Sequence, residues 1–274
     1  MRSDKRRVVL VGCGMVGMSY AYAMLNQNTV DELVLIDVNR LRAEGEAMDL
    51  NHGLAFSGSH MRIWAGDYND CNNADIVVIC AGVAQAPGES RRDLLKRNME
   101  VFKSIIDPIT ESGFNGIFLV ATNPVDIMTE ITYKLSGFNP RRVIGSGTAL
   151  DSARLRYLLG SYIQADPRSV HAYVIGEHGD SEFVPWSNAM LSTKPITDLI
   201  AESKGKLNIE ELASVFHLPH TNVETPNIVW ASTKTAEPPA KLPVITGDRA
   251  NDENISAFGL TNFRGINHQF GMLR

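Results

Sequence analysis

The chain has 274 residues, of which 44% are hydrophobic and 21% are charged. Its 26 Lys and Arg residues against 31 Asp and Glu give a formal net charge of −5, which lacks the basic excess that nucleic acids or anionic membranes usually require of a partner. A chain of this length can bury one large core or two moderate ones, and we expect two lobes.

The cysteines and the N-terminal segment indicate the compartment. Cys13, Cys71 and Cys80 are too few and too scattered for a disulfide framework. The charged first residues lead into an apolar run that glycines interrupt, which fits neither a signal peptide nor a membrane-spanning helix. We therefore expect a soluble protein of the reducing cytoplasm.

Apolar runs rich in Val and Ile alternate with stretches of helical period, as in a parallel sheet that helices cover on both faces. The expected strands are Arg7–Val11, Leu33–Asp37, Ile76–Cys80, Gly116–Ala121 and Val143–Gly145. The fold class is therefore expected to be α/β, with a doubly wound parallel sheet. We expect a first lobe over 1–146 and a second over 147–274.

Three stretches have helical spacing. Residues 18–25 follow the first strand, and apolar side chains recur every three or four residues over 93–109, on a helix that Gly113 would end. Residues 151–163 open with Asp, a favourable residue for the first turn of a helix. After about Phe216 the next segment contains five prolines and no clear period, so we expect a loop-rich or disordered tail.

The first strand is followed by a G-x-G-x-x-G motif formed by Gly12, Gly14 and Gly17. Glycines there allow a tight turn and bring the backbone close to a pyrophosphate at a helix N-terminus. The motif alone is weak, but Asp37 lies 20 residues after Gly17, at the end of a second strand. A carboxylate there can bind both ribose hydroxyls of NAD and would repel the 2′-phosphate of NADP. The pattern predicts NAD, with another kind of doubly wound sheet as the alternative.

Two further patterns carry charged candidates. His178 stands between Gly176 and Gly179 after an apolar run, although a lone histidine is often structural. Asp151 and Arg154 are three residues apart and share one face of a helix turn. One helix could thus present a group that orients a histidine and a clamp for a carboxylate, and a plain intrahelical ion pair is the alternative.

Loops at strand ends supply the remaining candidates. The segment 82–92 contains Pro, Gly and two arginines, and could close as a lid that carries Arg91 into a site. Thr122 and Asn123 end another strand, at the edge where ligands bind in doubly wound sheets.

Taken in order, these segments resemble the bacterial L-lactate dehydrogenases of the lactate/malate dehydrogenase family. The resemblance covers the first 215 or so residues. It rests on VGCGMVG, LVLIDVN, EGEAMDLNHG, WAGDY, DIVVICAG, PGESRRDL, FLVATNPVDI, RVIGSGTALDSARLRYLL and VHAYVIGEHGDSE.

The resemblance implies the catalytic roles. His178 would give a proton to the ketone oxygen of pyruvate and take it back from lactate, while Asp151 would orient it and raise its pKa. Arg154 would bind the substrate carboxylate through two parallel hydrogen bonds, which lysine cannot supply. Arg91 would polarise the ketone, and Asn123 would hydrogen-bond the reacting oxygen.

The family also implies the NAD contacts and a cis bond between Asn123 and Pro124. The implied NAD-binding residues are Gly12, Gly14, Met15, Val16, Gly17, Asp37, Ala81, Gly82, Thr122, Asn123 and Ser146. No metal is expected, because the other histidines lack companion cysteines or an H-E-x-x-H spacing.

Substrate choice and regulation also follow from the resemblance. Gln85 stands where lactate-specific members carry glutamine and malate-specific ones arginine, and a neutral amide suits the methyl group of pyruvate. Arg156 and His171 match positions that bind fructose 1,6-bisphosphate at a subunit interface in activated members, although both could be plain surface residues. A homo-oligomer, the tetramer of the family, is the expected assembly.

The resemblance ends at about residue 216. Family members continue with a long helix that carries a threonine beside the substrate, and no threonine here can be assigned to that role. The second lobe, α+β in the family, is therefore expected to be incomplete, with lower stability and activity. An inactive NAD-binding remnant and a malate dehydrogenase remain the alternatives to an L-lactate dehydrogenase.

Overall fold

The computed structural model describes residues 5–83, 88, 91–179 and 181–208. The chain divides into two compact units, Met1–Ser146 and Gly147–Arg274. The expected loop-rich tail after Phe216 lies outside the described residues.

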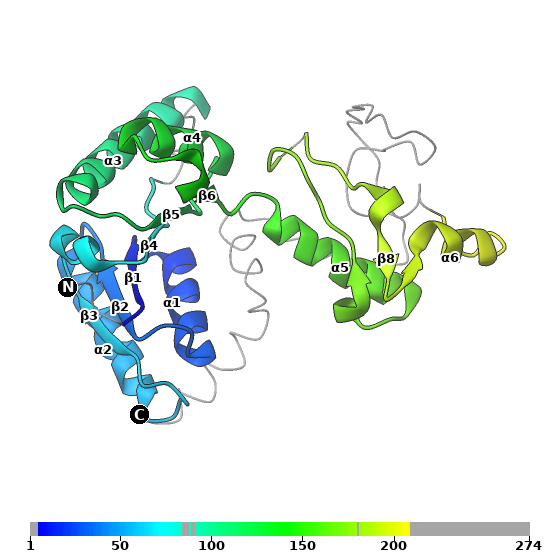
Figure 1. The fold of residues 1–274 in the computed structure, drawn as a ribbon, viewed down its shortest axis with the longest axis horizontal. Coiled ribbons are helices and arrows are strands. Elements are labelled where there is room, and N and C mark those ends of the chain that lie inside the picture. The colour runs from blue at the N-terminus through cyan, green and yellow to red at the C-terminus, as the bar shows by residue number, and fades with distance from the viewer. Residues whose placement is uncertain (1–4, 84–87, 89–90, 180, 209–274) are drawn as a thin grey trace. The chain divides into compact units, whose positions relative to one another are not determined.

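The first unit is a doubly wound α/β domain around a six-stranded parallel sheet (Figure 1). Its strands lie in the order β3-β2-β1-β4-β5-β6, so the direction of winding reverses between β1 and β4. Ligands bind at such a reversal in doubly wound sheets, outside the carboxyl ends of the strands. The strands are β1 (Arg7–Val11), β2 (Glu32–Ile36), β3 (Arg62–Ala65), β4 (Ile76–Ile79), β5 (Ile117–Val120) and β6 (Val143–Gly145).

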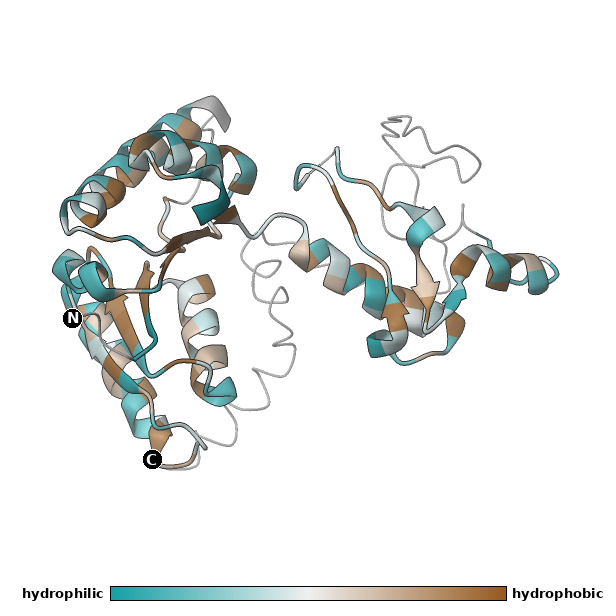
Figure 2. Cartoon of the chain, in the orientation of Figure 1, coloured by the Kyte–Doolittle hydropathy of each residue, from teal (hydrophilic) through white to brown (hydrophobic). Residues whose placement is uncertain are grey.

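Helices cover both faces of this sheet. Val9 and Val11 belong to one apolar core, while Val8 and Leu10, the alternate positions of β1, belong to another. The strands are accordingly mostly hydrophobic in Figure 2. The first core is completed by α3 (Arg91–Glu111), and α4 (Val125–Ser136) adds Met128 to it; the second is completed by α1 (Met15–Gln27) and α2 (Arg40–Leu54).

The predicted long helix is confirmed and begins two residues earlier than expected. Pro108 lies inside α3, and its carbonyl still accepts a hydrogen bond from the backbone N–H of Ser112. Gly113 follows with a φ of 86°, a left-handed conformation that glycine adopts without strain and that ends the helix as predicted.

The second unit combines helices with a small antiparallel sheet. It contains α5 (Ala149–Ile163), β7 (Val170–His171), β8 (Met190–Leu191), β9 (Lys194–Pro195) and α6 (Ile196–Glu202). Leu155 and Leu159 of α5 pack with Val174 and with the fully buried ring of Trp186. This core holds α5 in the second unit through the turns that follow its first one.

Short 3-10 helices complete the described elements, and they are η1 (Tyr68–Asn73), η2 (Pro140–Arg142), η3 (Pro167–Ser169) and η4 (Trp186–Asn188). Among the helices of the described residues, none combines the length and the apolar character needed to span a membrane.

Candidate active site

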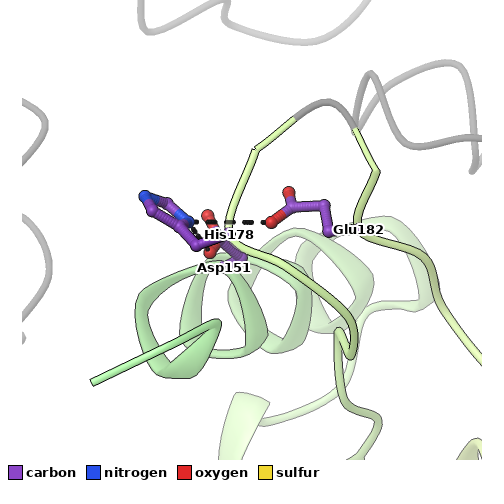
Figure 3. A group of neighbouring side chains, drawn as sticks. All are labelled: Asp151, His178 and Glu182. Carbon is purple, nitrogen blue, oxygen red and sulfur yellow. Dashed lines mark hydrogen bonds and ion pairs between the residues drawn. The ribbon is translucent and has the colours of Figure 1, made fainter. Parts of the chain in front are cut away.

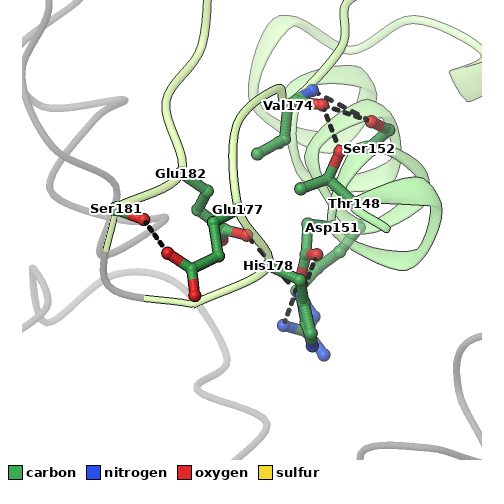
Figure 4. A network of polar contacts seen from close by, with 9 residues as sticks. Thr148, Asp151, Ser152, Val174, Glu177, His178, Ser181 and Glu182 are labelled. Atoms are coloured by element: carbon green, nitrogen blue, oxygen red, sulfur yellow. Dashed lines mark hydrogen bonds and ion pairs between the residues drawn. The ribbon is translucent and has the colours of Figure 1, made fainter. Parts of the chain in front are cut away.

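The first turn of α5 is tied to the segment that precedes the histidine loop. The hydroxyl of Thr148 donates a hydrogen bond of 2.6 Å to the carbonyl of Val174. The hydroxyl of Ser152 accepts a hydrogen bond of 2.9 Å from the backbone N–H of Val174 (Figure 4). Asp151 lies between these two anchors and is buried, so its carboxylate has a defined position.

His178 lies on a loop that closes on itself. Ile175 and Phe183 exchange two backbone hydrogen bonds of 2.9 Å at the base of the loop. Gly176 and Gly179 have φ angles of 106° and 147°, in the region that favours glycine. The two glycines that flank His178 in the sequence are therefore required by the shape of the loop.

This loop brings His178 to Asp151 (Figure 3). Nδ1 of the imidazole lies 2.7 Å from Oδ2 of the carboxylate, although the two residues are 27 positions apart in the chain. The contact fixes the orientation of the ring and directs Nε2 away from the carboxylate.

The contact also sets the charge of the pair. The hydrogen bond to Asp151, assisted by the carboxylate of Glu182, raises the pKa of His178 to about 10, although burial opposes this. Burial acts to raise the pKa of Asp151, but the hydrogen bond and charge of His178 outweigh it and the pKa is lowered. The imidazole is therefore protonated at neutral pH, and Asp151 is ionised.

Arg154 lies on the same face of α5, as its spacing predicted. Its Nη1 is 3.8 Å from Oδ1 of Asp151, and 46% of its side chain is exposed. A contact this long and this exposed contributes little to stability. Nearly half of this side chain thus remains accessible to a carboxylate from outside.

Glu182 is a neighbour of His178 that sequence reasoning missed. Its Oε2 lies 3.7 Å from Nδ1 of the imidazole (Figure 3). The residue comes four positions after His178 on the returning arm of the loop, and this spacing gave no signal without the backbone turn between them. Ligand atoms of Asp151, His178 and Glu182 lie within 4.8 Å of one another, but a protonated Nδ1 disfavours metal binding.

In the first unit, the glycine motif forms a tight turn at the end of β1. Gly12 has a φ of 101°, and a Cβ there would lie 2.5 Å from the backbone N of Ala81. A Cβ at Gly17 would overlap the carbonyl oxygen of Gly12, whereas nothing lies within 4 Å of one at Gly14. The turn thus leaves open space over Gly14, beside the first turn of α1, where a pyrophosphate can approach the backbone.

Asp37 lies directly after β2 and faces this turn. Its Oδ2 accepts a hydrogen bond of 2.8 Å from the N–H of Cys13, and its Oδ1 accepts one of 2.9 Å from Asn39. A carboxylate has about four acceptor positions, so it can also accept the ribose hydroxyls. Burial, with the charge of Asp37, raises the pKa of the Cys13 thiol to about 12, which makes it unreactive.

The other residues expected to contact NAD lie at the carboxyl ends of neighbouring strands. The hydroxyl of Thr122, after β5, donates a hydrogen bond of 2.7 Å to the carbonyl of Ala81, after β4. A Cβ at Gly82 would lie 2.7 Å from Cγ2 of Thr122, so the close approach of these two loops requires glycine. The backbone N–H of Ser146, after β6, donates a hydrogen bond of 2.8 Å to the carbonyl of Val120 in β5. Of these strands, β4 borders the point where the winding reverses, and β5 and β6 follow it in the sheet.

Met15 and Val16 form the first turn of α1. Asn123 is exposed, and its bond to Pro124 is cis, as expected.

Of the four remaining candidates, two lie wholly or partly outside the described residues and two are described. Gln85 lies outside the described residues, and Arg91 begins α3, with its side chain outside the description. Arg156 lies on α5, and its buried Nε has no hydrogen-bond partner among the described residues. His171 is exposed on β7.

The first unit thus has the loop, the acidic residue and the winding reversal of a dinucleotide-binding domain, and the second unit holds a protonated histidine on a buried carboxylate. The first set of features is that of an oxidoreductase that uses a nicotinamide nucleotide, and the charged histidine of the second unit is chemically suited to donate a proton.

Family models narrow this class. The lactate/malate dehydrogenase NAD-binding domain matches residues 6–145, and the α/β C-terminal domain of the same family matches residues 148–218. The chain belongs to the lactate/malate dehydrogenase family, and NAD is its cofactor.

Individual relatives and solved structures agree with the family models. The chain is 55% identical over 215 residues to an L-lactate dehydrogenase of Geobacillus sp. (strain WCH70), which covers 78% of this chain and 67% of the relative. It is 53% identical to L-lactate dehydrogenase 2 of Bacillus cereus (strain ATCC 10987), over 79% of this chain and 68% of the relative.

Two crystal structures give the same result. A lactate dehydrogenase from a Medee basin deep-sea metagenome library is similar with a TM-score of 0.75 and 58% identity, over 79% of this chain and 68% of that one. The minor L-lactate dehydrogenase of Enterococcus mundtii, in its ligand-bound form, has a TM-score of 0.75 and 46% identity, over 78% of this chain and 69% of that one.

Proposed function

We propose that this chain is an L-lactate dehydrogenase, which catalyses the reversible reduction of pyruvate to L-lactate. The observation that carries the proposal is the buried Asp151–His178 pair, with 2.7 Å between Oδ2 and Nδ1. The chain that carries this pair belongs to a family that binds NAD and acts on 2-hydroxy acids and 2-oxo acids. NADH, when bound, supplies the hydride that the ketone carbon receives.

His178 supplies the proton. With Nδ1 bonded to Asp151, the imidazolium presents its second N–H at Nε2 to the ketone oxygen and becomes neutral as the alcohol forms. In the reverse direction the neutral imidazole takes the proton of the lactate hydroxyl. Asp151 keeps Nδ1 protonated throughout, so that only Nε2 exchanges its proton with substrate.

Charged and amide groups of this chain position the substrate. Arg154 is exposed enough to bind the carboxylate of pyruvate through two parallel hydrogen bonds. Asn123, exposed at the end of β5, is suited to hydrogen-bond the reacting oxygen, and Arg91 is assigned to polarise the ketone from its position in the family pattern. The proposed function thus includes the roles of Arg154, Asn123 and Arg91 in holding the substrate.

The preference for pyruvate is assigned to Gln85. A neutral amide tolerates the methyl group of pyruvate, but it leaves the second carboxylate of oxaloacetate without a counter-charge. Gln85→Arg is therefore expected to raise kcat/KM for oxaloacetate relative to pyruvate by about a hundredfold, since a charge-assisted contact contributes about 1.5–3 kcal/mol. Steady-state kinetics with both substrates measures the ratio, with Gln85→Lys to test a point charge. A variant that still prefers pyruvate by the original margin would contradict the assignment.

Regulation by fructose 1,6-bisphosphate is assigned to Arg156 and His171. Nε of Arg156 is buried without a partner in the described part of the chain, and such a donor suits a phosphate oxygen. The bisphosphate is expected to lower KM for pyruvate at least about fivefold, the lower end of the coupling usual between sites. Arg156→Gln is expected to remove this response. An unchanged KM in the original chain would exclude the regulation.

Activated members of the family bind the bisphosphate at a subunit interface. We therefore propose that this chain forms a homo-oligomer, the tetramer of the family. The three cysteines are free, and burial raises their pKa values to about 12, which fits a protein of a reducing cytoplasm.

Product analysis tests the proposed function directly. Protein supplied with pyruvate and NADH is expected to form lactate of the L configuration in an amount equal to the NADH consumed. Chiral chromatography and the loss of NADH absorbance measure the two quantities. Malate from oxaloacetate at a higher kcat/KM would instead assign the chain to the malate side of the family.

A further inference from the structure

Two carboxylates face the same nitrogen of His178. Oδ2 of Asp151 lies 2.7 Å from Nδ1, and Oε2 of Glu182 lies 3.7 Å from it. The two acids come from different elements, since Asp151 is on α5 and Glu182 is on the returning arm of the histidine loop (Figures 3 and 4). The proton donor is thus held from both the helix and its own loop.

Glu182 is a largely buried carboxylate, so it needs a positive charge nearby. Its side chain is only 14% exposed, and its buried Oε2 has no partner at hydrogen-bond distance within the described residues. The carboxylate of Asp151 also lies close to it, with the ligand atoms of the two acids within 4.8 Å of one another. A carboxylate in such surroundings is unstable unless a positive charge faces it. The imidazolium of His178 supplies that charge at 3.7 Å.

The other charged groups around His178 complete the balance. On α5, Arg154 lies 3.8 Å from Asp151, and on the loop Glu177 accepts a hydrogen bond of 3.2 Å from the hydroxyl of Ser181. Asp151 and Glu182 carry two negative charges against the two positive charges of His178 and Arg154. When His178 gives its proton to substrate, the two carboxylates lose one of these two positive charges, and only that of Arg154 remains.

We propose that Glu182 is a second positioning residue for the proton donor: it holds the imidazolium of His178 from the loop, while Asp151 holds it from the helix. Glu182 therefore favours the protonated enzyme, which reduces pyruvate, over the neutral form, which oxidises lactate. The raised pKa of His178, to which Glu182 contributes after Asp151, is consistent with this role. The assignment of its effect to catalysis rests on the proposed function.

The direction of the pH shift follows from the form of His178 that each reaction needs. Pyruvate reduction needs the protonated imidazole, so kcat/KM falls as pH rises through the pKa of His178. Lactate oxidation needs the neutral imidazole and rises through the same pKa. Removing the charge of Glu182 lowers this pKa, and both curves move to lower pH. A merely structural residue would instead lower both activities at every pH.

Glu182→Gln tests the proposal, with Glu177→Gln as the matched control. Glu177 is the adjacent loop carboxylate, but its partner is Ser181 rather than the imidazole. We expect Glu182→Gln to move both pH profiles down by about half to one pH unit, the effect of one partly screened charge. Below the shifted pKa, pyruvate reduction should be unchanged within about twofold. Glu177→Gln should move neither profile. Glu182→Asp keeps the negative charge, so its pH profiles should lie close to those of the original chain.

A measurement that does not depend on turnover separates this proposal from the proposed function. NMR of protein with labelled histidine gives the pKa of His178 directly, and the signal is assigned by its loss in His178→Asn. A lower pKa in Glu182→Gln than in Glu177→Gln supports the proposal even if pyruvate is not reduced, in which case the proposed function fails alone. Equal pKa values in the two variants, in protein that reduces pyruvate, overturn the proposal and leave the function intact.

Discussion

Replacing His178 with asparagine is expected to lower kcat for pyruvate reduction by about a hundredfold to ten thousandfold, the usual contribution of a positioned acid. Asparagine keeps a polar side chain near Asp151 but has no proton to give at neutral pH. Nothing in the dinucleotide turn of the first unit changes, so the affinity for NADH should stay the same. Stopped-flow or steady-state absorbance of NADH measures turnover, and NADH fluorescence measures binding.

The matched control for this variant is His52→Asn. His52 is exposed on α2, in the first unit, and has no part in the proposed chemistry. The control should keep both turnover and NADH affinity. If His178→Asn retained more than about a tenth of the original kcat, His178 would not be the proton donor.

Replacing Gly17 with alanine is expected to weaken NADH binding by about a hundredfold or more, because several backbone contacts of about 1.5–3 kcal/mol each depend on the turn. The new Cβ would overlap the carbonyl oxygen of Gly12, which is backbone and cannot rotate away. The turn must therefore open, and the start of α1 must move with it. Fluorescence titration with NADH measures the loss.

Gly45→Ala is the control for the glycine variant. Gly45 lies in α2, and a Cβ there meets nothing within 4 Å. Alanine favours a helix over glycine by about 0.5–1 kcal/mol, so this control should be slightly more stable and should bind NADH unchanged. Tight NADH binding by Gly17→Ala would show that the pyrophosphate does not use this turn.

The sheet of the first unit could be predicted because strands buried on both faces are continuous apolar runs. The five predicted strands are all present, with ends that differ by at most one residue. β3 was missed because it lies at the edge of the sheet, with Arg62 exposed and Trp64 half-buried beneath arginine side chains. The apolar run of such a strand is short, only residues 63–65 here.

Three helices were also missed, α2, α4 and α6. On α2 the buried residues are Ala43, Ala47 and Leu50, and charged residues occupy much of the rest. Alanines that pack against a sheet give a weak periodic signal, so the spacing did not predict this helix.

The two halves of the candidate site differ in how far sequence could predict them. The glycine turn depends on residues close together in the chain, and its spacing carried the NAD prediction. Asp151 and His178 are 27 residues apart, and no periodicity connects them. Their contact came from the family resemblance, and Glu182 came only from the structure, because its place depends on how the loop returns between Ile175 and Phe183.

The proposed function has this chain reduce pyruvate with His178 as the proton donor. NADH consumption with pyruvate tests this most directly, on one preparation that is first shown by fluorescence to bind NADH. We expect turnover that yields L-lactate and is lost in His178→Asn. Binding of NADH without turnover of pyruvate would contradict it, and would leave a protein that binds the cofactor but catalyses no hydride transfer to this substrate.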